Sequence, residues 1–101
     1  MWIIVFYDIE VKTNKDKKAY TKFRNSLLFN GFMQMQYSVY SYFCGSMQEV
    51  EKIKGNIKAM IPEAGEVRIL TITDKQYSRI EIMLNPKKGK KEENREVGLF
   101  F

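Results

Sequence analysis

Histidine is absent from all 101 residues of the sequence. This absence removes the commonest general base, the Ser-His and Cys-His nucleophile pairs, and every metal motif built on imidazole. Carboxylates can still hold a hard cation such as Mg²⁺, which binds oxygen ligands. Any hydrolytic chemistry would therefore depend on carboxylates and a bound metal ion.

Cysteine and long apolar runs are also scarce. Cys44 is the single cysteine, which excludes a disulfide framework or a Cys-based zinc site within one chain, and we expect it to pack as a small apolar residue. The apolar run Trp2–Tyr7 is too short to span a bilayer, and no Lys or Arg precedes it as in a signal peptide. The sequence therefore predicts a cytoplasmic protein with no membrane contact.

Positive charge and aromatic side chains are plentiful. Seventeen Lys and Arg face twelve Asp and Glu, giving a net charge of +5, and there are seven Phe, six Tyr and one Trp. The length fits one domain. The charge favours a polyanionic partner such as nucleic acid, although a purely solubilising role also fits. So many aromatics indicate an interface in addition to a core.

The first elements are marked by clear local signals. Trp2–Tyr7 is continuously apolar and β-prone, which predicts a central strand buried on both faces. Thr13 and Asp16 have the spacing of a capping box and open a helix that runs to about Asn30. Gly31 suits the C-terminal stop of that helix.

Later elements follow from capping signals and apolar spacing. Ser46 and Glu49 form a second box, Pro62 ends the helix that follows, and Thr73 begins a third helical signal. Residues 80–84 fit either the end of that helix or an extended segment. The elements expected after Gly31 are strands over 32–36 and 38–44, a helix from 47 to the residue before Pro62, a strand over 66–73 and a short helix over 74–81.

This order predicts an α+β fold of the ferredoxin-like βαββαβ type, with four antiparallel strands and two helices on one face. The other face would be apolar and open, so a second copy of the chain is expected to cover it. We divide the chain into a core over 1–84 and a charged loop with an apolar C-terminal strand over 85–101. That last strand is expected to dock on the edge of the partner chain's sheet.

Asp8 is the candidate site residue, because it follows the strand expected to be central. A cap for the following turn is the alternative role for its side chain. One carboxylate is a weak ligand, but a two-fold dimer supplies two, and Mg²⁺ is often held by one or two carboxylates plus substrate phosphate. Glu10 lies close in sequence and is either a second ligand or a solvated loop charge.

Basic residues crowd the first helix. Side chains three and four residues apart share a helix face, and each cation can neutralise one phosphate. An ordinary solvated helix face would have the same pattern. The candidate nucleic-acid-binding residues are Lys15, Lys18, Lys22 and Arg24 on the first helix, with Lys75 and Arg79 on the short third helix.

Several runs together resemble the CRISPR-associated protein 2 family. The likeness extends from Trp2 to about Leu84, and no single motif carries it. Two of the runs look most like members from type II CRISPR systems, namely the Lys-Phe-Arg of residues 22–24 and the Leu-Thr-Ile-Thr-Asp-Lys-Gln-Tyr of 70–77. The matching runs are 4–9, 19–24, 31–33, 36–40 and 69–77.

The resemblance implies a ferredoxin-like homodimer that sits between two dimers of the CRISPR integrase and holds protospacer DNA during spacer acquisition. Some family members are described as metal-dependent endonucleases that act on single-stranded RNA or double-stranded DNA. The family's acidic metal residue corresponds to Asp8, and the serine of its glutamine-x-serine-valine motif corresponds to Ser38. The cofactor implied is Mg²⁺. A scaffold without chemistry and a free-standing RNA-binding or regulatory domain remain the alternatives.

Overall fold

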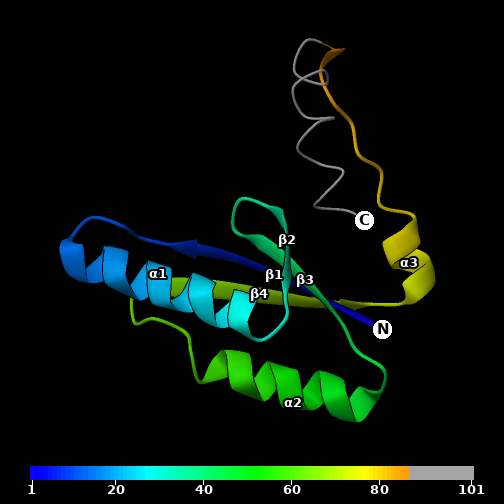
Figure 1. Ribbon diagram of the computed structural model, residues 1–101, viewed down its shortest axis with the longest axis horizontal. Helices are drawn as coiled ribbons and strands as arrows, with labels where there is room; N and C mark the ends of the chain where they lie inside the picture. The colour runs from blue at the N-terminus through cyan, green and yellow to red at the C-terminus, as the bar shows by residue number, and fades with distance from the viewer. Residues whose placement is uncertain (87–101) are drawn as a thin grey trace.

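The computed structural model describes residues 1–86 and contains one antiparallel sheet of four strands in the order β2-β3-β1-β4. Figure 1 shows α1 and α2 together as one layer, with α3 set apart near the N-terminus. This arrangement confirms the ferredoxin-like α+β prediction. The elements are β1 (Trp2–Ile9), α1 (Asn14–Phe29), β2 (Met33–Gln36), β3 (Val39–Phe43), α2 (Met47–Lys58), β4 (Gly65–Ile72) and α3 (Asp74–Ser78).

Both ends of α1 follow from the expected local signals. The Thr13 hydroxyl accepts a hydrogen bond from the Asp16 amide at 3.1 Å, and Asp16 Oδ2 accepts one from the Thr13 amide at 3.2 Å. The backbone amide of Thr13 stabilises the carboxylate and so lowers the pKa of Asp16. At the other end Gly31 has φ of 89° and the Phe32 amide donates to the Leu27 carbonyl at 3.0 Å. This is a Schellman stop, which requires the left-handed conformation that glycine adopts without strain.

The other two helices begin as expected, but both end early: α2 stops at Lys58, before the residue preceding Pro62, and α3 stops at Ser78. Ser46 accepts a hydrogen bond from the Glu49 amide, and Thr73 and Gln76 form a complete capping box. The expectation that the third helix reaches residue 81 was wrong. It ends at Ser78, because the Arg79 amide bonds back only three residues, and the chain then leaves the helix.

The core lies between the sheet and the layer formed by α1 and α2. Alternate residues of β1 point into it, from Ile3 through Val5 and Tyr7 to Ile9, because successive side chains of a strand face opposite sides. Helix residues at three- and four-residue spacing cover them from the other side. The helix residues buried in the core are Phe23 and Leu27 of α1 and Val50, Ile53 and Ile57 of α2.

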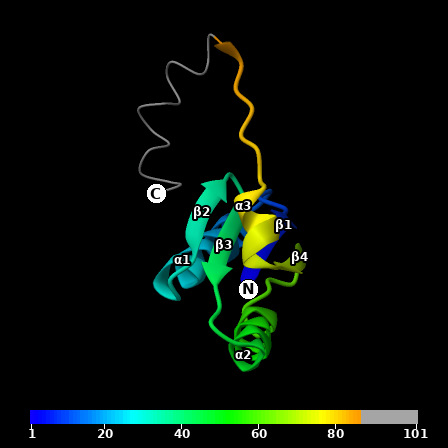
Figure 2. The same cartoon turned by 90° about the vertical axis from the view of Figure 1, so that its right-hand side faces the viewer.

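The opposite face of the sheet is largely uncovered, and this corrects the expectation that β1 is buried on both sides. β1 is an interior strand, but Phe6 is 37% exposed and its neighbour Leu70 on β4 is 51% exposed. Figures 1 and 2 place α1 and α2 away from this side. We call this side, centred on Phe6, Leu70 and Phe43, the open face.

Helix α3 covers one end of the open face. This contact was not predicted from the sequence. The Tyr77 ring stacks on the indole of Trp2, with centroids 3.8 Å apart and planes 5° from parallel. The Tyr77 hydroxyl lies 3.5 Å from Ser41 Oγ, and Asp74 Oδ1 pairs with the N-terminal ammonium of Met1 at 2.8 Å. The start of β1 is therefore fixed to the segment that follows β4.

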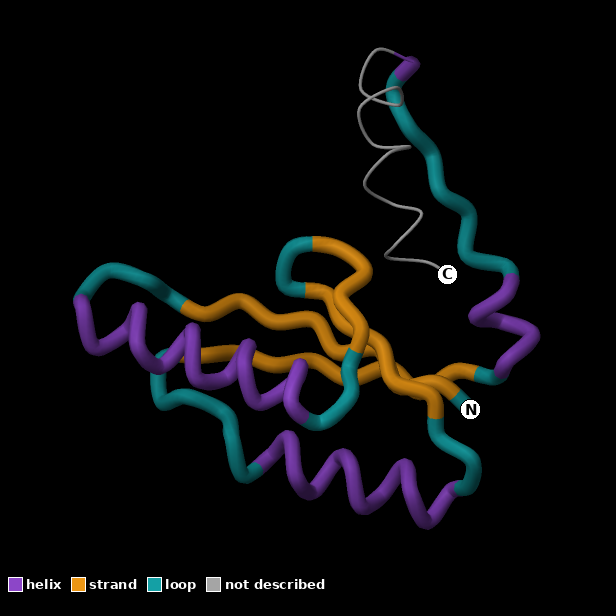
Figure 3. Tube along the Cα trace, viewed as in Figure 1, coloured by secondary structure: helices purple, strands orange, loops and turns teal. Residues whose placement is uncertain are grey.

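Residues 79–85, which follow α3, have no regular secondary structure. Figure 3 shows this segment as a loop that leads away from the sheet. The expected C-terminal strand over 97–101 and most of the charged loop lie outside the described residues. The division at residue 84 and the docking of the last strand thus stay predictions. In the described part of the chain, no helix is long and apolar enough to cross a membrane.

Two buried tyrosine hydroxyls in the core lack partners. Tyr40 is fully buried, its ring stacks on that of Tyr7, and neither hydroxyl has a hydrogen-bond partner among residues 1–86. Burial, and then the neighbouring Tyr40, raise the pKa of Tyr7 far above its ordinary value. An unsatisfied buried hydroxyl costs free energy, whereas the ring that carries it contributes packing.

We expect Tyr40→Phe to raise the free energy of unfolding by about 1 kcal/mol, because it removes an unsatisfied polar group and keeps the ring. Urea unfolding followed by circular dichroism measures the change. Tyr37→Phe is the matched control and should have little effect, since Tyr37 is exposed. A loss of stability in Tyr40→Phe would contradict the prediction and indicate a buried water bonded to the hydroxyl.

Candidate functional site: an acidic cleft and a basic helix

Asp8 lies on the open face, at the end of β1 that is distant from α3. It borders a shallow cleft of about 330 Å³, whose walls include Tyr37 and Ser38 of the β2–β3 turn and Glu66 and Arg68 of β4. The Asp8 side chain is exposed and opposite in direction to Tyr7 and Ile9, which point into the core. The structure thus places Ser38 in the same cleft as Asp8.

The β2–β3 turn is held next to Asp8 by the backbone. The Tyr7 amide donates a hydrogen bond to the Ser38 carbonyl at 3.1 Å. Ser38 has φ of 64°, and it is the one non-glycine residue with positive φ in the described chain. This left-handed conformation costs about 1 kcal/mol or more for a residue with a Cβ. The strain lies at the residue that faces the candidate site.

Two members of the cleft, Glu66 and Arg68, were not predicted from the sequence. Glu66 is directly opposite Asp8 across the antiparallel pair of β1 and β4, so both carboxylates emerge on one face. Arg68, two residues further on, points to the same face, and its Nε pairs with Glu66 Oε1 at 2.5 Å. Only the strand register reveals this grouping, because Asp8 and Glu66 are far apart in sequence.

The cleft fits a cation that takes few protein ligands. Residues 1–86 contain no group of three or more His, Cys, Asp or Glu side chains arranged to hold a metal ion. Asp8 and Glu66 offer hard carboxylate oxygens on one face, and this donor set suits Mg²⁺, which keeps several waters and binds substrate phosphates. It does not suit a metal enclosed entirely by protein ligands.

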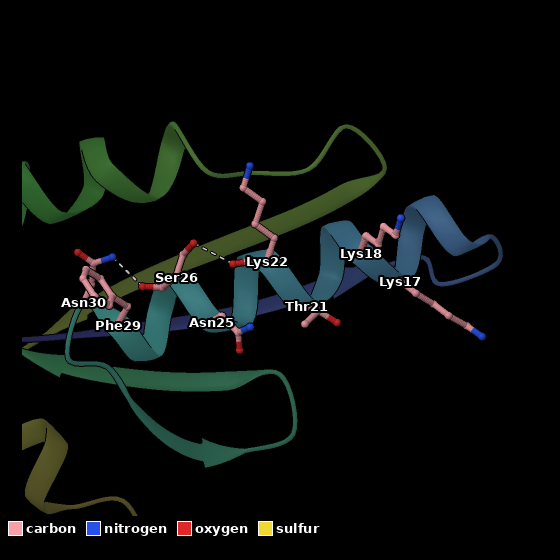
Figure 4. Close-up of a pocket in the computed structure, with 8 residues that line it drawn as sticks. All are labelled: Lys17, Lys18, Thr21, Lys22, Asn25, Ser26, Phe29 and Asn30. Atoms are coloured by element: carbon pink, nitrogen blue, oxygen red, sulfur yellow. Dashed lines mark hydrogen bonds between the residues drawn. The ribbon is translucent and has the colours of Figure 1, made fainter.

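The cations expected on the first helix lie on a different side of the molecule. Lys18 and Lys22 are on the solvent face of α1, opposite the buried Phe23 and Leu27. Figure 4 shows this surface, with Lys18 and Lys22 pointing to one side of α1 and Phe29 near the helix end. Lys17, which was not among the predicted residues, also lines the surface but points to the other side of the helix. We call Lys17, Lys18 and Lys22 the α1 lysine face.

No member of the α1 lysine face forms an ion pair with another described residue. The four ion pairs within residues 1–86 join Met1 to Asp74, Lys12 to Glu10, Lys54 to Glu51 and Arg68 to Glu66. The ammonium groups of α1 therefore remain available to an external anion.

The remaining predicted cations do not gather on that face. Lys15 lies in a separate recess, beside Glu10 and Glu63. Lys75 and Arg79 belong to α3 and its cap, at the opposite end of the sheet from the Asp8 cleft. The structure thus divides the predicted cations into four groups, since Arg24 also lies apart, near Tyr37, and the α1 lysine face is the most concentrated.

Arg24 is close to the β2–β3 turn. Interaction with the Tyr20 hydroxyl raises the pKa of Tyr37, and the positive charge of Arg24 acts in the opposite direction. The rings of Tyr20 and Tyr37 stack with centroids 6.3 Å apart. The Tyr20–Tyr37 ring pair therefore connects α1 with the turn that carries Ser38.

Comparison with known proteins identifies the family. The profile of the family described as CRISPR associated protein Cas2 matches residues 1–80. The chain belongs to the Cas2 family. It is 46% identical over 88 residues to the CRISPR-associated endoribonuclease Cas2 of Parvibaculum lavamentivorans, covering 87% of each chain. The Cas2 endoribonuclease of Flavobacterium psychrophilum is 37% identical, over 86% of this chain and 76% of that protein.

A solved Cas2 structure has the same fold. The crystal structure of Streptococcus pyogenes Cas2 at pH 6.5 superposes with a TM-score of 0.64, at 21% identity, over 83% of this chain and all of that one. The relatives do not separate CRISPR types, so the expected likeness to type II members stays a prediction.

Proposed function

We propose that this Cas2-family chain is a homodimeric subunit of CRISPR spacer acquisition, which binds protospacer DNA through its phosphate backbone and bridges two integrase dimers. Membership of the Cas2 family supports the adaptation role. The observation that carries nucleic-acid binding is the α1 lysine face, whose cations have no ion-pair partner in residues 1–86. Backbone contacts of this kind position nucleic acid without reading its sequence.

The homodimer is supported by the open face. Phe6 and Leu70 leave an apolar surface in the middle of the sheet, and such surfaces are normally covered. A second copy of the chain would cover it around a two-fold axis. Docking of the segment 97–101 on the partner's sheet edge belongs to the same proposal.

We further propose that the subunit is a metal-dependent endonuclease acting on RNA or double-stranded DNA. Its relatives in Parvibaculum lavamentivorans and Flavobacterium psychrophilum are named endoribonucleases. Asp8, with Glu66 beside it, would hold Mg²⁺. The bound ion supplies activation of water and stabilisation of charge on the phosphate. The β2–β3 turn would shape the substrate side of the cleft, because the Tyr7–Ser38 backbone bond fixes its position.

One observation favours a scaffold without chemistry. The described chain supplies two carboxylates at the cleft, and one of them is paired with Arg68. A subunit that only binds nucleic acid and bridges integrase dimers would need neither. Spacer acquisition at the normal level by an Asp8→Asn protein would support this candidate.

Binding through the α1 lysine face is tested by changing Lys17, Lys18 and Lys22 together to Gln. We expect affinity for a short single-stranded oligonucleotide to fall about 100-fold at 0.1 M salt. The slope of log K against log salt should decrease by about 2, since each lost phosphate contact removes about 0.7. Fluorescence anisotropy over a salt series measures both quantities.

A second triple variant is the control, with Lys52, Lys54 and Lys58 of α2 changed to Gln, because it alters the net charge by the same amount. We expect it to retain most of the affinity. An unchanged slope in the α1 variant, or equal losses in both, would exclude the α1 lysine face as the binding surface.

A further inference from the structure

Arg68 is the cation of the Asp8 cleft, and neither the sequence patterns nor the family resemblance assigned it a role. It lies on β4 with its side chain on the open face, and it shares the cleft with Asp8 and Ser38. Its cross-strand partner is Phe6, and Asp8 is the next residue of β1 on the same face. A diagonal neighbour of this kind is within reach of a long side chain.

The Arg68 guanidinium is bonded through Nε, and its two terminal nitrogens are not bonded to any described residue. Its Nε donates to Glu66 Oε1, and the side chain is 69% exposed. Arginine presents its donors as a planar fork that matches two oxygens of a phosphate. In the single chain, Glu66 thus fixes the fork while its terminal donors remain available to a ligand.

The charges of the cleft favour the same ligand once a cation is bound. Asp8 and Glu66 are like charges directly opposite each other, an arrangement that is unfavourable on its own. Arg68 offsets one of them, so the three side chains leave one net negative charge. A divalent cation reverses the sign, and an anionic phosphodiester is then attracted.

We propose that Arg68, held by Glu66, binds the non-bridging oxygens of a phosphodiester placed in the Asp8 cleft. The inference rests on the proposed function, because it adds a phosphate-binding residue to the site where cleavage is proposed. A purely structural Arg68 would only offset the repulsion between Asp8 and Glu66. The two roles predict different salt slopes of binding for a variant in which Glu66 and Arg68 both lose their charge.

The experiment compares Arg68→Gln, Glu66→Gln and the double variant, with Lys52→Gln as the control of equal charge change outside the cleft. Cleavage of a labelled oligonucleotide is measured with Mg²⁺, and binding is measured over a salt series. We expect Arg68→Gln to lower the cleavage rate about 100-fold, as for loss of one charge-stabilising donor. Its salt slope should fall by about 0.7, and Lys52→Gln should change neither quantity.

The double variant decides between the two roles. The salt slope decides, because Glu66 is itself a proposed Mg²⁺ ligand and its loss lowers cleavage in either case. If Arg68 binds phosphate, the double variant keeps the lowered slope. Recovery of the wild-type slope in the double variant would overturn the proposal. Circular dichroism and the melting temperature verify folding, and Arg68→Lys, which keeps a point charge, should restore the slope more than the rate.

Failure of the nuclease proposal would give different results from failure of the Arg68 proposal. If the wild type does not cleave, or if Asp8→Asn cleaves as well as the wild type, the nuclease proposal fails. The binding arm still tests Arg68 in that case. A slope lowered by Arg68→Gln but not by Lys52→Gln supports phosphate binding, and an unchanged slope refutes it.

Discussion

Replacing Asp8 by Asn should reduce Mg²⁺-dependent cleavage about 1,000-fold while leaving nucleic-acid binding nearly unchanged. The amide has the same shape but no charge, so it loses the attraction that holds a divalent cation. A metal ion contributes several kcal/mol of charge stabilisation in the transition state, which corresponds to a factor of this size. Binding should persist because the α1 lysine face lies on another side of the molecule.

The geometry also predicts how the Asp8→Asn variant folds. Asp8 is exposed and faces Glu66 across the strand pair, so removing its charge relieves a like-charge contact. We expect the melting temperature without metal to stay the same or rise slightly, which excludes misfolding as the cause of lost activity. Any rise in melting temperature on adding Mg²⁺ should disappear, because the variant no longer binds the ion.

Glu10→Gln is the matched control for this variant. Glu10 is an exposed carboxylate two residues after Asp8, and it forms an exposed ion pair with Lys12 at 3.6 Å. Its loss should leave cleavage within about twofold, because surface pairs of this kind contribute little. Equal losses in the two variants, or full activity in Asp8→Asn, would contradict a metal-binding role for Asp8.

The second large effect concerns the open face. Changing Leu70 to Glu should weaken the proposed homodimer at least 1,000-fold, because each copy would then bury an uncompensated carboxylate at the centre of the interface. Removing such a charge from water costs several kcal/mol. Sedimentation velocity over a concentration series gives the dissociation constant.

Phe29→Glu provides the comparison for the dimer test. Phe29 is 91% exposed at the end of α1, on the side opposite the sheet, so the same change to Glu should leave the dimer intact. Leu70 is half-exposed in the single chain, and its variant should therefore keep a native circular dichroism spectrum. A stable dimer in Leu70→Glu, or dissociation in Phe29→Glu, would place the interface elsewhere.

Signals confined to a few neighbouring residues were the most reliable guide to the fold. The Thr13–Asp16 box and the Gly31 stop mark the two ends of α1 where the sequence predicted them, because a cap depends only on residues within one turn. The end of α3 was misplaced, since residues 79–81 carry no stop signal of their own. The exposure of Phe6 was missed for another reason, which is that an apolar run does not show whether both of its faces find partners.

The candidate site was only half visible in the sequence. Asp8 was recognisable as an acid at the end of an apolar strand, and Ser38 came from the family resemblance. Glu66 and Arg68 join them through the pairing of β1 with β4, whose register no local pattern specifies. Lys15 was grouped with Lys18 and Lys22 by helical spacing, yet the recess beside Glu10 and Glu63 separates it from them.

The strand order has a consequence for how the chain is made. β1 leaves the ribosome first, but both of its sheet neighbours are synthesised later, and its pairing with β4 joins Trp2 to Ile72 near opposite ends of the described chain. Such long-range pairing forms slowly, and an apolar strand that waits for its partners is prone to aggregate. The nascent chain therefore carries its most apolar strand with one edge unpaired until β4 has been made. Slow refolding at low concentration, rather than low final stability, should limit the yield of native protein.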